Sequence, residues 1–202
     1  MKYLSILFAV ALCFALPVVA QDSSEEDFSE LTSFIENQVR IQNTPGLAIA
    51  IVQADEIVYS EGFGVRSTET NDPMTTDTLF RIGSTTKPLT SIGLLMLVES
   101  GDINLDESVS SYIPEFEIND AITVRHLLTH TAGLNDQAIA YGSLDPDSLG
   151  NFVEGLPEGV LFADAGELHS YSNQGFNIAG HIIEAVTGQY YADYMENEVF
   201  PA

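Results

Sequence analysis

The clearest helical pattern lies between residues 25 and 42. Four apolar residues recur there at intervals of three or four positions: Phe28, Leu31, Ile35 and Val39. This spacing places them on one face of a helix, and Ser24 with Asp27 resembles a capping box at its beginning. The pattern therefore predicts an amphipathic helix that ends before the turn-forming segment 43–46.

Two β-rich runs follow this predicted helix. Residues 47–52 form a short apolar run, residues 57–63 form a second run, and Ala54-Asp55 lies between them. Two such runs joined by a tight polar turn are typical of an antiparallel hairpin.

The rest of the chain has the pattern of helices separated by polar segments. A helical stripe begins after Gly83 and is closed by Gly101; its apolar members are Leu89, Ile92, Leu95 and Met96. Further helices are expected over residues 106–112, 123–129, 174–186 and 190–199. The stretch 134–169 is rich in Gly, Asp and Pro, so we predict that most of it is loop.

This order of elements predicts an α+β fold in which an antiparallel sheet is flanked by helices. Only one hairpin is visible in the sequence. An isolated two-stranded hairpin is marginally stable in water, so the sheet needs further partners.

The first 20 residues differ from the remainder. They contain 17 apolar residues and no acidic one, whereas all 30 Asp and Glu residues lie beyond Ala20. Lys2 before an apolar run and a small-residue site at 18–20 are typical of a secretory signal peptide. We expect residues 1–20 to be removed, leaving a domain at 21–202 that is periplasmic or extracellular and has no stable membrane anchor.

The expected mature chain is strongly acidic. It carries 5 basic and 30 acidic side chains, a formal charge of −25. A field of this sign repels phosphates, which excludes nucleic acid as a partner. The only cysteine, Cys13, leaves with the signal peptide, so no disulfide, thiol nucleophile or cysteine metal site is expected.

The single lysine of the expected mature chain lies three residues after a serine. Ser84 and Lys87 share one face if this segment is helical. A lysine can take the proton of a serine hydroxyl when burial lowers its pKa from about 10.4. We therefore predict that Lys87 is well buried beside Ser84. The alternative is a capping serine with a solvated lysine.

A second candidate constellation precedes the helix expected at 174–186. Tyr171 and Asn173 are two residues apart, so in an extended segment both side chains point the same way. A tyrosine can transfer protons, and an asparagine can bind a carbonyl or an ammonium group. The alternative is that Ser172 or Asn173 caps the helix and Tyr171 packs against it.

His126 and His130 form a third candidate. Their i, i+4 spacing would place two imidazoles on one helical face, as in zinc sites, but no carboxylate accompanies them in the pattern of a zinc protease. A structural role is favoured over a metal-dependent hydrolase. His169 and His181 show no partner pattern, and we interpret them as ordinary polar or core residues.

Three ordered motifs together resemble the serine β-lactamase and penicillin-binding-protein superfamily, and within it the class C and esterase-like branch. They are Phe80-Arg81-Ile82-Gly83-Ser84-Thr85-Thr86-Lys87, Leu127-Leu128-Thr129-His130-Thr131-Ala132-Gly133-Leu134 and Tyr171-Ser172-Asn173. The resemblance implies a β-lactamase/transpeptidase-like fold with a mostly helical subdomain. It makes the motif around His130 a structural signature.

The resemblance also implies roles for four residues. Ser84 would be the acylated nucleophile, Lys87 its proton partner, Tyr171 the general base and later acid, and Asn173 a ligand for substrate and lysine. The implied protein is an exported serine hydrolase that acts on a small molecule or peptide with a carbonyl electrophile. It needs no cofactor and no metal. The alternative is a catalytically inactive binding or structural module of the same fold.

One family element has no counterpart in the sequence. Members carry a later strand with Lys or His, a small residue and Gly, which donates to the oxyanion, but after Tyr171 this chain has no lysine, and its one histidine is followed by Ile182-Ile183. We therefore expect a domain that is incomplete at its C-terminus and impaired in activity, since the loss of one oxyanion donor typically costs about a hundredfold in rate. The substrate, whether β-lactam, D-amino-acid peptide or ester, and the oligomeric state stay open.

Overall fold

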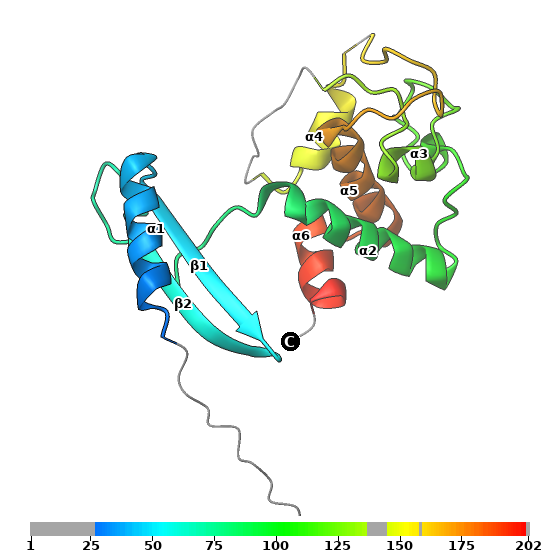
Figure 1. Cartoon of the computed structure of the whole chain (residues 1–202). Coiled ribbons are helices and arrows are strands. Elements are labelled where there is room, and N and C mark those ends of the chain that lie inside the picture. Colours follow the sequence, from blue (N-terminus) through cyan, green and yellow to red (C-terminus); the bar gives the residue numbers. More distant parts are fainter. Residues whose placement is uncertain (1–26, 137–144, 158, 201–202) are drawn as a thin grey trace, which may run out of the picture. The chain divides into compact units, whose positions relative to one another are not determined.

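The chain forms two compact units in the computed structural model, which describes residues 27–136, 145–157 and 159–200 (Figure 1). One unit reaches to Phe80 and the other begins at Arg81. The expected signal peptide, residues 1–20, and the expected capping residue Ser24 lie outside the described residues. Within the described ranges, none of the helices combines the length and the apolar character that crossing a bilayer requires.

The first unit consists of a helix and a hairpin, as the hydrophobic pattern predicts. Helix α1 spans Ser29–Ile41, strand β1 Gly46–Gln53 and strand β2 Glu56–Gly64. The strands pair antiparallel, and both turn residues, Ala54 and Asp55, have positive φ angles of 50° and 67°. Two left-handed residues match the twist of a tight hairpin turn, so the predicted hairpin and the position of its turn are confirmed.

Helix α1 packs against the hairpin through apolar contacts and one polar network. The ring of Phe28 lies 5.0 Å from that of Tyr59, and Ile35 and Phe63 are buried. Thr32 Oγ1 lies 2.8 Å from Tyr59 Oη. The small antiparallel sheet therefore has a helix on one face (Figure 1).

The second unit is mostly helical. Its elements are η1 Gly83–Thr85, α2 Thr86–Ser100, η2 Val109–Ser111, α3 Val124–Leu128, α4 Ser148–Glu154, α5 Asn173–Thr187, α6 Tyr191–Tyr194 and η3 Met195–Val199. Helix α5 contacts α2, α3, α4 and α6, and four of its side chains are completely buried: Ile178, Ala179, Ile182 and Ile183. The core of this unit is thus built around α5, whose first residues belong to the Tyr171-Ser172-Asn173 motif.

The face that α2 buries differs from the predicted one. The structure buries Thr90, Gly93, Leu94 and Leu97, whereas the expected core residues Ile92, Leu95 and Met96 are 47%, 46% and 37% exposed. Both sets have helical spacing because α2 is apolar around most of its circumference. The small Gly93 lets α5 and α6 approach the buried face of α2. A Cβ at this position would lie 3.2 Å from the Tyr194 ring and 3.4 Å from Ile183.

One of two further predictions holds and the other needs correction. The described part of 134–169 is mostly loop, as predicted, and the one helix there is the seven-residue α4, whose Leu149, Phe152 and Val153 have helical spacing. Within 106–112, only the short η2 is helical. There Ser108 Oγ accepts the backbone N–H of Ser110, and such local polar bonds compete with helix formation.

Candidate active site

Ser84 lies in the short η1 turn that runs directly into α2. Gly83 before it has a φ of +54°, a left-handed conformation that glycine adopts without steric cost. The side chain of Ser84 is exposed at this helix start, so its hydroxyl is accessible to a substrate.

Lys87 comes three residues later and faces Ser84. Its Nζ donates to Ser84 Oγ at 3.2 Å and to Asn173 Oδ1 at 2.6 Å. Tyr171 Oη donates to Ser84 Oγ at 2.6 Å. Four residues from two motifs about 87 positions apart therefore meet around one serine hydroxyl, which is the arrangement that nucleophilic catalysis by serine requires.

The structure places Lys87 beside Ser84, as expected, and buries it in part. It also lines the cavity described below. Its Nζ lies 4.7 Å from the centroid of the Tyr171 ring and 5.7 Å from that of Phe176. Aromatic faces attract a cation at this distance, so these rings and Asn173 hold the ammonium group in place.

The pKa of Tyr171 is lower than that of an ordinary tyrosine. Interaction with the Lys87 ammonium, followed by the hydrogen bond with Ser84, lowers the pKa of Tyr171, while partial desolvation and the charge of Asp136 oppose this change. An adjacent cation stabilises a phenolate. The site therefore makes this tyrosine easier to deprotonate than an ordinary tyrosine.

Two residues outside the four candidate catalytic positions hold the Tyr171-Ser172-Asn173 segment: His130, which the sequence indicated in a structural motif, and Asp136, which no sequence pattern indicated. His130 Nδ1 accepts the backbone N–H of Ser172 at 3.1 Å. Asp136 accepts three hydrogen bonds at the beginning of α5. Both contacts join residues about 40 positions apart, so local periodicity contains no signal for them.

The histidine pair does not form the metal site considered above. Helix α3 ends at Leu128, and His130 has a φ of +59°, so the two imidazoles do not share a helical face. His126 Nδ1 accepts the backbone N–H of Thr123 at 3.1 Å as part of a capping box. In the portion of the chain that is described, no three His, Cys, Asp or Glu side chains gather in a way that could hold a metal ion.

A cavity of about 400 Å³ opens beside the nucleophile candidate. Ser84, Lys87 and Asn173 form its polar end. Leu149, Phe176 and Tyr191 contribute apolar surface. A carbonyl group at the polar end would thus have room for an attached apolar group.

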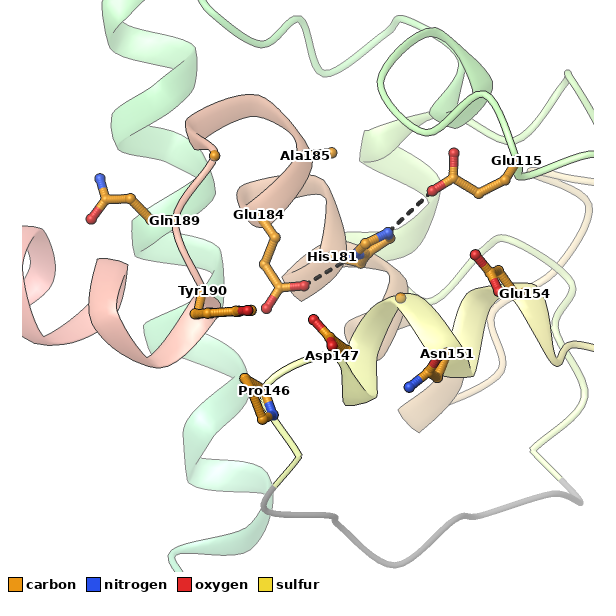
Figure 2. Close-up of a pocket in the computed structure, with 12 residues that line it drawn as sticks. Glu115, Pro146, Asp147, Asn151, Glu154, His181, Glu184, Ala185, Gln189 and Tyr190 are labelled. Atoms are coloured by element: carbon orange, nitrogen blue, oxygen red, sulfur yellow. Dashed lines mark hydrogen bonds and ion pairs between the residues drawn. The ribbon is translucent and has the colours of Figure 1, made fainter.

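A second, larger pocket of about 660 Å³ lies away from Ser84 (Figure 2). Its centre is His181, whose Nδ1 lies 2.9 Å from Glu184 Oε2 and whose Nε2 lies 3.3 Å from Glu115 Oε1. From its sequence context, His181 is interpreted as an ordinary polar or core residue. The structure agrees, since the two ring nitrogens of His181 connect α5 to the segment that contains Glu115.

The sequence model of one protein family, described as Beta-lactamase, matches residues 31–202. Protein flp of Staphylococcus aureus is 27% identical over 175 residues, which cover 83% of this chain and 35% of that protein.

Two solved structures are similar in both sequence and fold. The octameric penicillin-binding protein homologue from Pyrococcus abyssi has a TM-score of 0.71 and 30% identity, over 86% of this chain and 42% of that one. The D-amino acid amidase from Ochrobactrum anthropi SV3, complexed with D-phenylalanine, has a TM-score of 0.69 and 28% identity, over 86% of this chain and 49% of that one. The chain thus spans between a third and a half of the length of these relatives.

Proposed function

This chain belongs to the beta-lactamase family, and on that premise we propose that it is a serine hydrolase that cleaves amide or ester bonds through an acyl-enzyme at Ser84. The observation that carries the proposal is the position of Ser84 Oγ, 2.6 Å from Tyr171 Oη and 3.2 Å from Lys87 Nζ. A serine with a purely structural role would not need two proton-transferring groups beside its accessible hydroxyl.

The proposed reaction begins when Ser84 Oγ attacks the carbonyl carbon. A C–O bond forms, the hydroxyl proton passes to the Tyr171 phenolate, and the carbonyl oxygen becomes an oxyanion near the backbone N–H of Ser84. Collapse of this intermediate breaks the bond to the leaving amine or alcohol, which takes the proton back from Tyr171. Water then attacks the ester by the same proton route and releases the acid.

Lys87 and Asn173 support this proton transfer. The ammonium group stabilises the Tyr171 phenolate, which is the cause of its lowered pKa. Asn173 keeps Lys87 in place through the 2.6 Å bond to its Oδ1. The Asn173 side chain also lines the cavity beside Ser84, where it can contact a bound substrate.

The proposed substrates are β-lactams, D-amino-acid peptides or simple esters. The names of two neighbouring structures, a penicillin-binding protein homologue and a D-amino acid amidase, support this range. The apolar surface of the cavity supports an acyl group with an apolar substituent.

We also propose that the protein is exported. The support is the amino-terminal sequence, in which Lys2, an apolar run and a small-residue site follow one another. An exported hydrolase would meet cell-wall peptides and β-lactams outside the cytoplasm.

Covalent labelling tests the proposed nucleophile. The chain is incubated with a fluorophosphonate probe and with a fluorescent penicillin, and peptide mass spectrometry locates the adduct. We expect an adduct on Ser84 with at least one probe and none in Ser84→Ala, because no other described residue has this proton-transfer environment. An unlabelled chain, or equal labelling of Ser84→Ala, would contradict the proposal and favour a non-catalytic module.

Ser91, in the helix that directly follows Ser84, provides the matched control. Ser91 Oγ donates to the backbone oxygen of Lys87 at 3.1 Å and has no contact with Ser84 or Tyr171 among the described bonds. Ser91→Ala therefore removes the same side-chain atoms as Ser84→Ala and should be labelled like the unmodified chain.

A further inference from the structure

Asp136 makes a concentrated set of contacts with the beginning of α5. Its Oδ1 accepts the backbone N–H groups of Asn173 at 2.8 Å and of Gln174 at 3.2 Å. Its Oδ2 accepts the side-chain amide of Asn173, with Nδ2 at 2.7 Å. One carboxylate thus binds both the backbone and the side chain of a residue that contacts Lys87.

We propose that Asp136 is a positioning residue that fixes the orientation of the Asn173 carboxamide, so that Asn173 presents its oxygen, and not its NH2 group, to Lys87. The inference rests on the proposed function of the Ser84 site. It adds a residue of a different segment to the four that the motifs contain.

The donor and acceptor inventory explains the effect. A carboxylate only accepts hydrogen bonds and an ammonium group only donates them, whereas a carboxamide does both at opposite ends. With Nδ2 on Asp136 and Oδ1 on Lys87, both bonds of Asn173 are made, at 2.7 Å and 2.6 Å. A flipped carboxamide would direct NH2 at the ammonium group and oxygen at the carboxylate, so both bonds would be lost.

The contact does more than cap a helix. Helix α5 already has an N-cap, because Ser172 Oγ accepts the backbone N–H of Gly175 at 3.0 Å. The two backbone N–H groups bound by Asp136 add to this cap. The third bond, to the Asn173 side chain, contributes nothing to the helix backbone and acts only on the direction of the carboxamide.

One substitution separates the two roles. In Asp136→Asn, the remaining oxygen can still accept the backbone N–H groups, but the new NH2 group faces the NH2 group of Asn173. Because the neutral amide loses the charge at the helix start, we expect a small drop in the urea midpoint, less than the drop in Asp136→Ala. We also expect the fluorophosphonate probe to label Ser84 at least ten times more slowly. Asp136→Ala removes both roles and should lower the midpoint further.

The pH profile of labelling gives a readout that a purely structural role would not move. The Lys87 ammonium is the first cause of the lowered pKa of Tyr171, so a displaced ammonium lets that pKa rise. The loss of the Asp136 charge acts in the opposite direction, but it is the smallest of the causes, so the effect of Lys87 dominates. The acid limb of the labelling rate should therefore move to higher pH in Asp136→Asn. The exchanged pair Asp136→Asn with Asn173→Asp restores a donor opposite an acceptor and should recover part of the rate.

The outcomes distinguish this inference from the proposed function. If the unmodified chain is labelled at Ser84 and Asp136→Asn has the same rate and pH profile, the positioning role is wrong and the hydrolase stands. If the unmodified chain is not labelled, the proposed function fails, and NMR decides the role of Asp136. The side-chain amide signal of Asn173 should be protected from solvent exchange in the unmodified chain and lose that protection in Asp136→Asn; equal protection would overturn the inference.

Discussion

At the scale of single residues, His130 shows how the site depends on a side chain outside the catalytic set. Its ring lies 4.6 Å from that of Tyr171 and 5.2 Å from that of Phe176, and its Nδ1 accepts the N–H of Ser172. An acceptor nitrogen carries no proton, so the contact requires neutral imidazole. Burial, followed by the charges of His169 and Lys87, lowers the pKa of His130, which favours that form.

The lowered pKa of His130 predicts a loss of stability in acid. Above about pH 6.5 the imidazole is neutral in the folded and the unfolded chain, and its contribution is present in full. Below that pH the unfolded chain binds a proton more readily than the folded chain, so the contribution is lost as the pH falls through the lowered pKa.

The variant His130→Gln tests this dependence. Glutamine keeps an oxygen that can accept the Ser172 N–H but loses the ring contacts and cannot titrate. We expect the variant to be less stable by about 1 kcal/mol at pH 7.5 and the difference to shrink towards pH 5. Urea unfolding of both proteins at the two pH values measures it, and a constant difference would show that His130 does not titrate as proposed.

At the scale of elements, the sequence predicts what neighbouring residues determine and misses what distant residues determine. The hairpin and α5 follow from periodicity and from turn residues such as Ala54-Asp55 and Gly188, which adopt left-handed conformations. Periodicity does not reveal which side of the apolar helix α2 faces α5. The contacts of Asp136 and His130 with the segment before α5 span 37 and 42 positions, so only the folded chain reveals them.

The close packing at Gly93 leads to a prediction for α2. A Cβ at this position would lie 3.2 Å from Tyr194 Cε1 and 3.3 Å from Met195 Sδ, so the branched side chain of Gly93→Val must displace both. We expect a loss of about 1–3 kcal/mol in the free energy of unfolding, despite the better helix propensity of valine. Urea unfolding measures the loss.

Leu95→Val is the control for this substitution. Leu95 lies on the same helix and is 46% exposed, so a change to valine there should alter stability by no more than about 0.5 kcal/mol. If Gly93→Val is as stable as Leu95→Val, the approach of α2 to α6 and η3 is looser than the structure shows.

At the scale of the whole molecule, charge is the dominant property. The chain has 30 acidic and 6 basic side chains, and two of the arginines, Arg66 and Arg125, are paired with Asp72 and Asp106. Most carboxylates therefore have no cation nearby, and their mutual repulsion opposes the compact state. The catalytic proposal places a lysine within this field, where Asn173 and aromatic rings, rather than a carboxylate, contact its ammonium group.

Screening of this repulsion should make the protein more stable in salt. The Debye length falls from about 30 Å at 0.01 M ionic strength to about 3 Å at 1 M, so added NaCl weakens repulsion between distant carboxylates while short-range contacts persist. Between 0.02 M and 0.5 M NaCl at pH 7.5 we expect Tm to rise by about 3 °C, which corresponds to about 1 kcal/mol for a chain of this size. At pH 4.5, where part of the carboxylates is protonated, the same titration should give a smaller rise. Thermal unfolding monitored by circular dichroism measures both series, and an equal rise at the two pH values would assign the effect to salt acting on apolar surface instead of on charge.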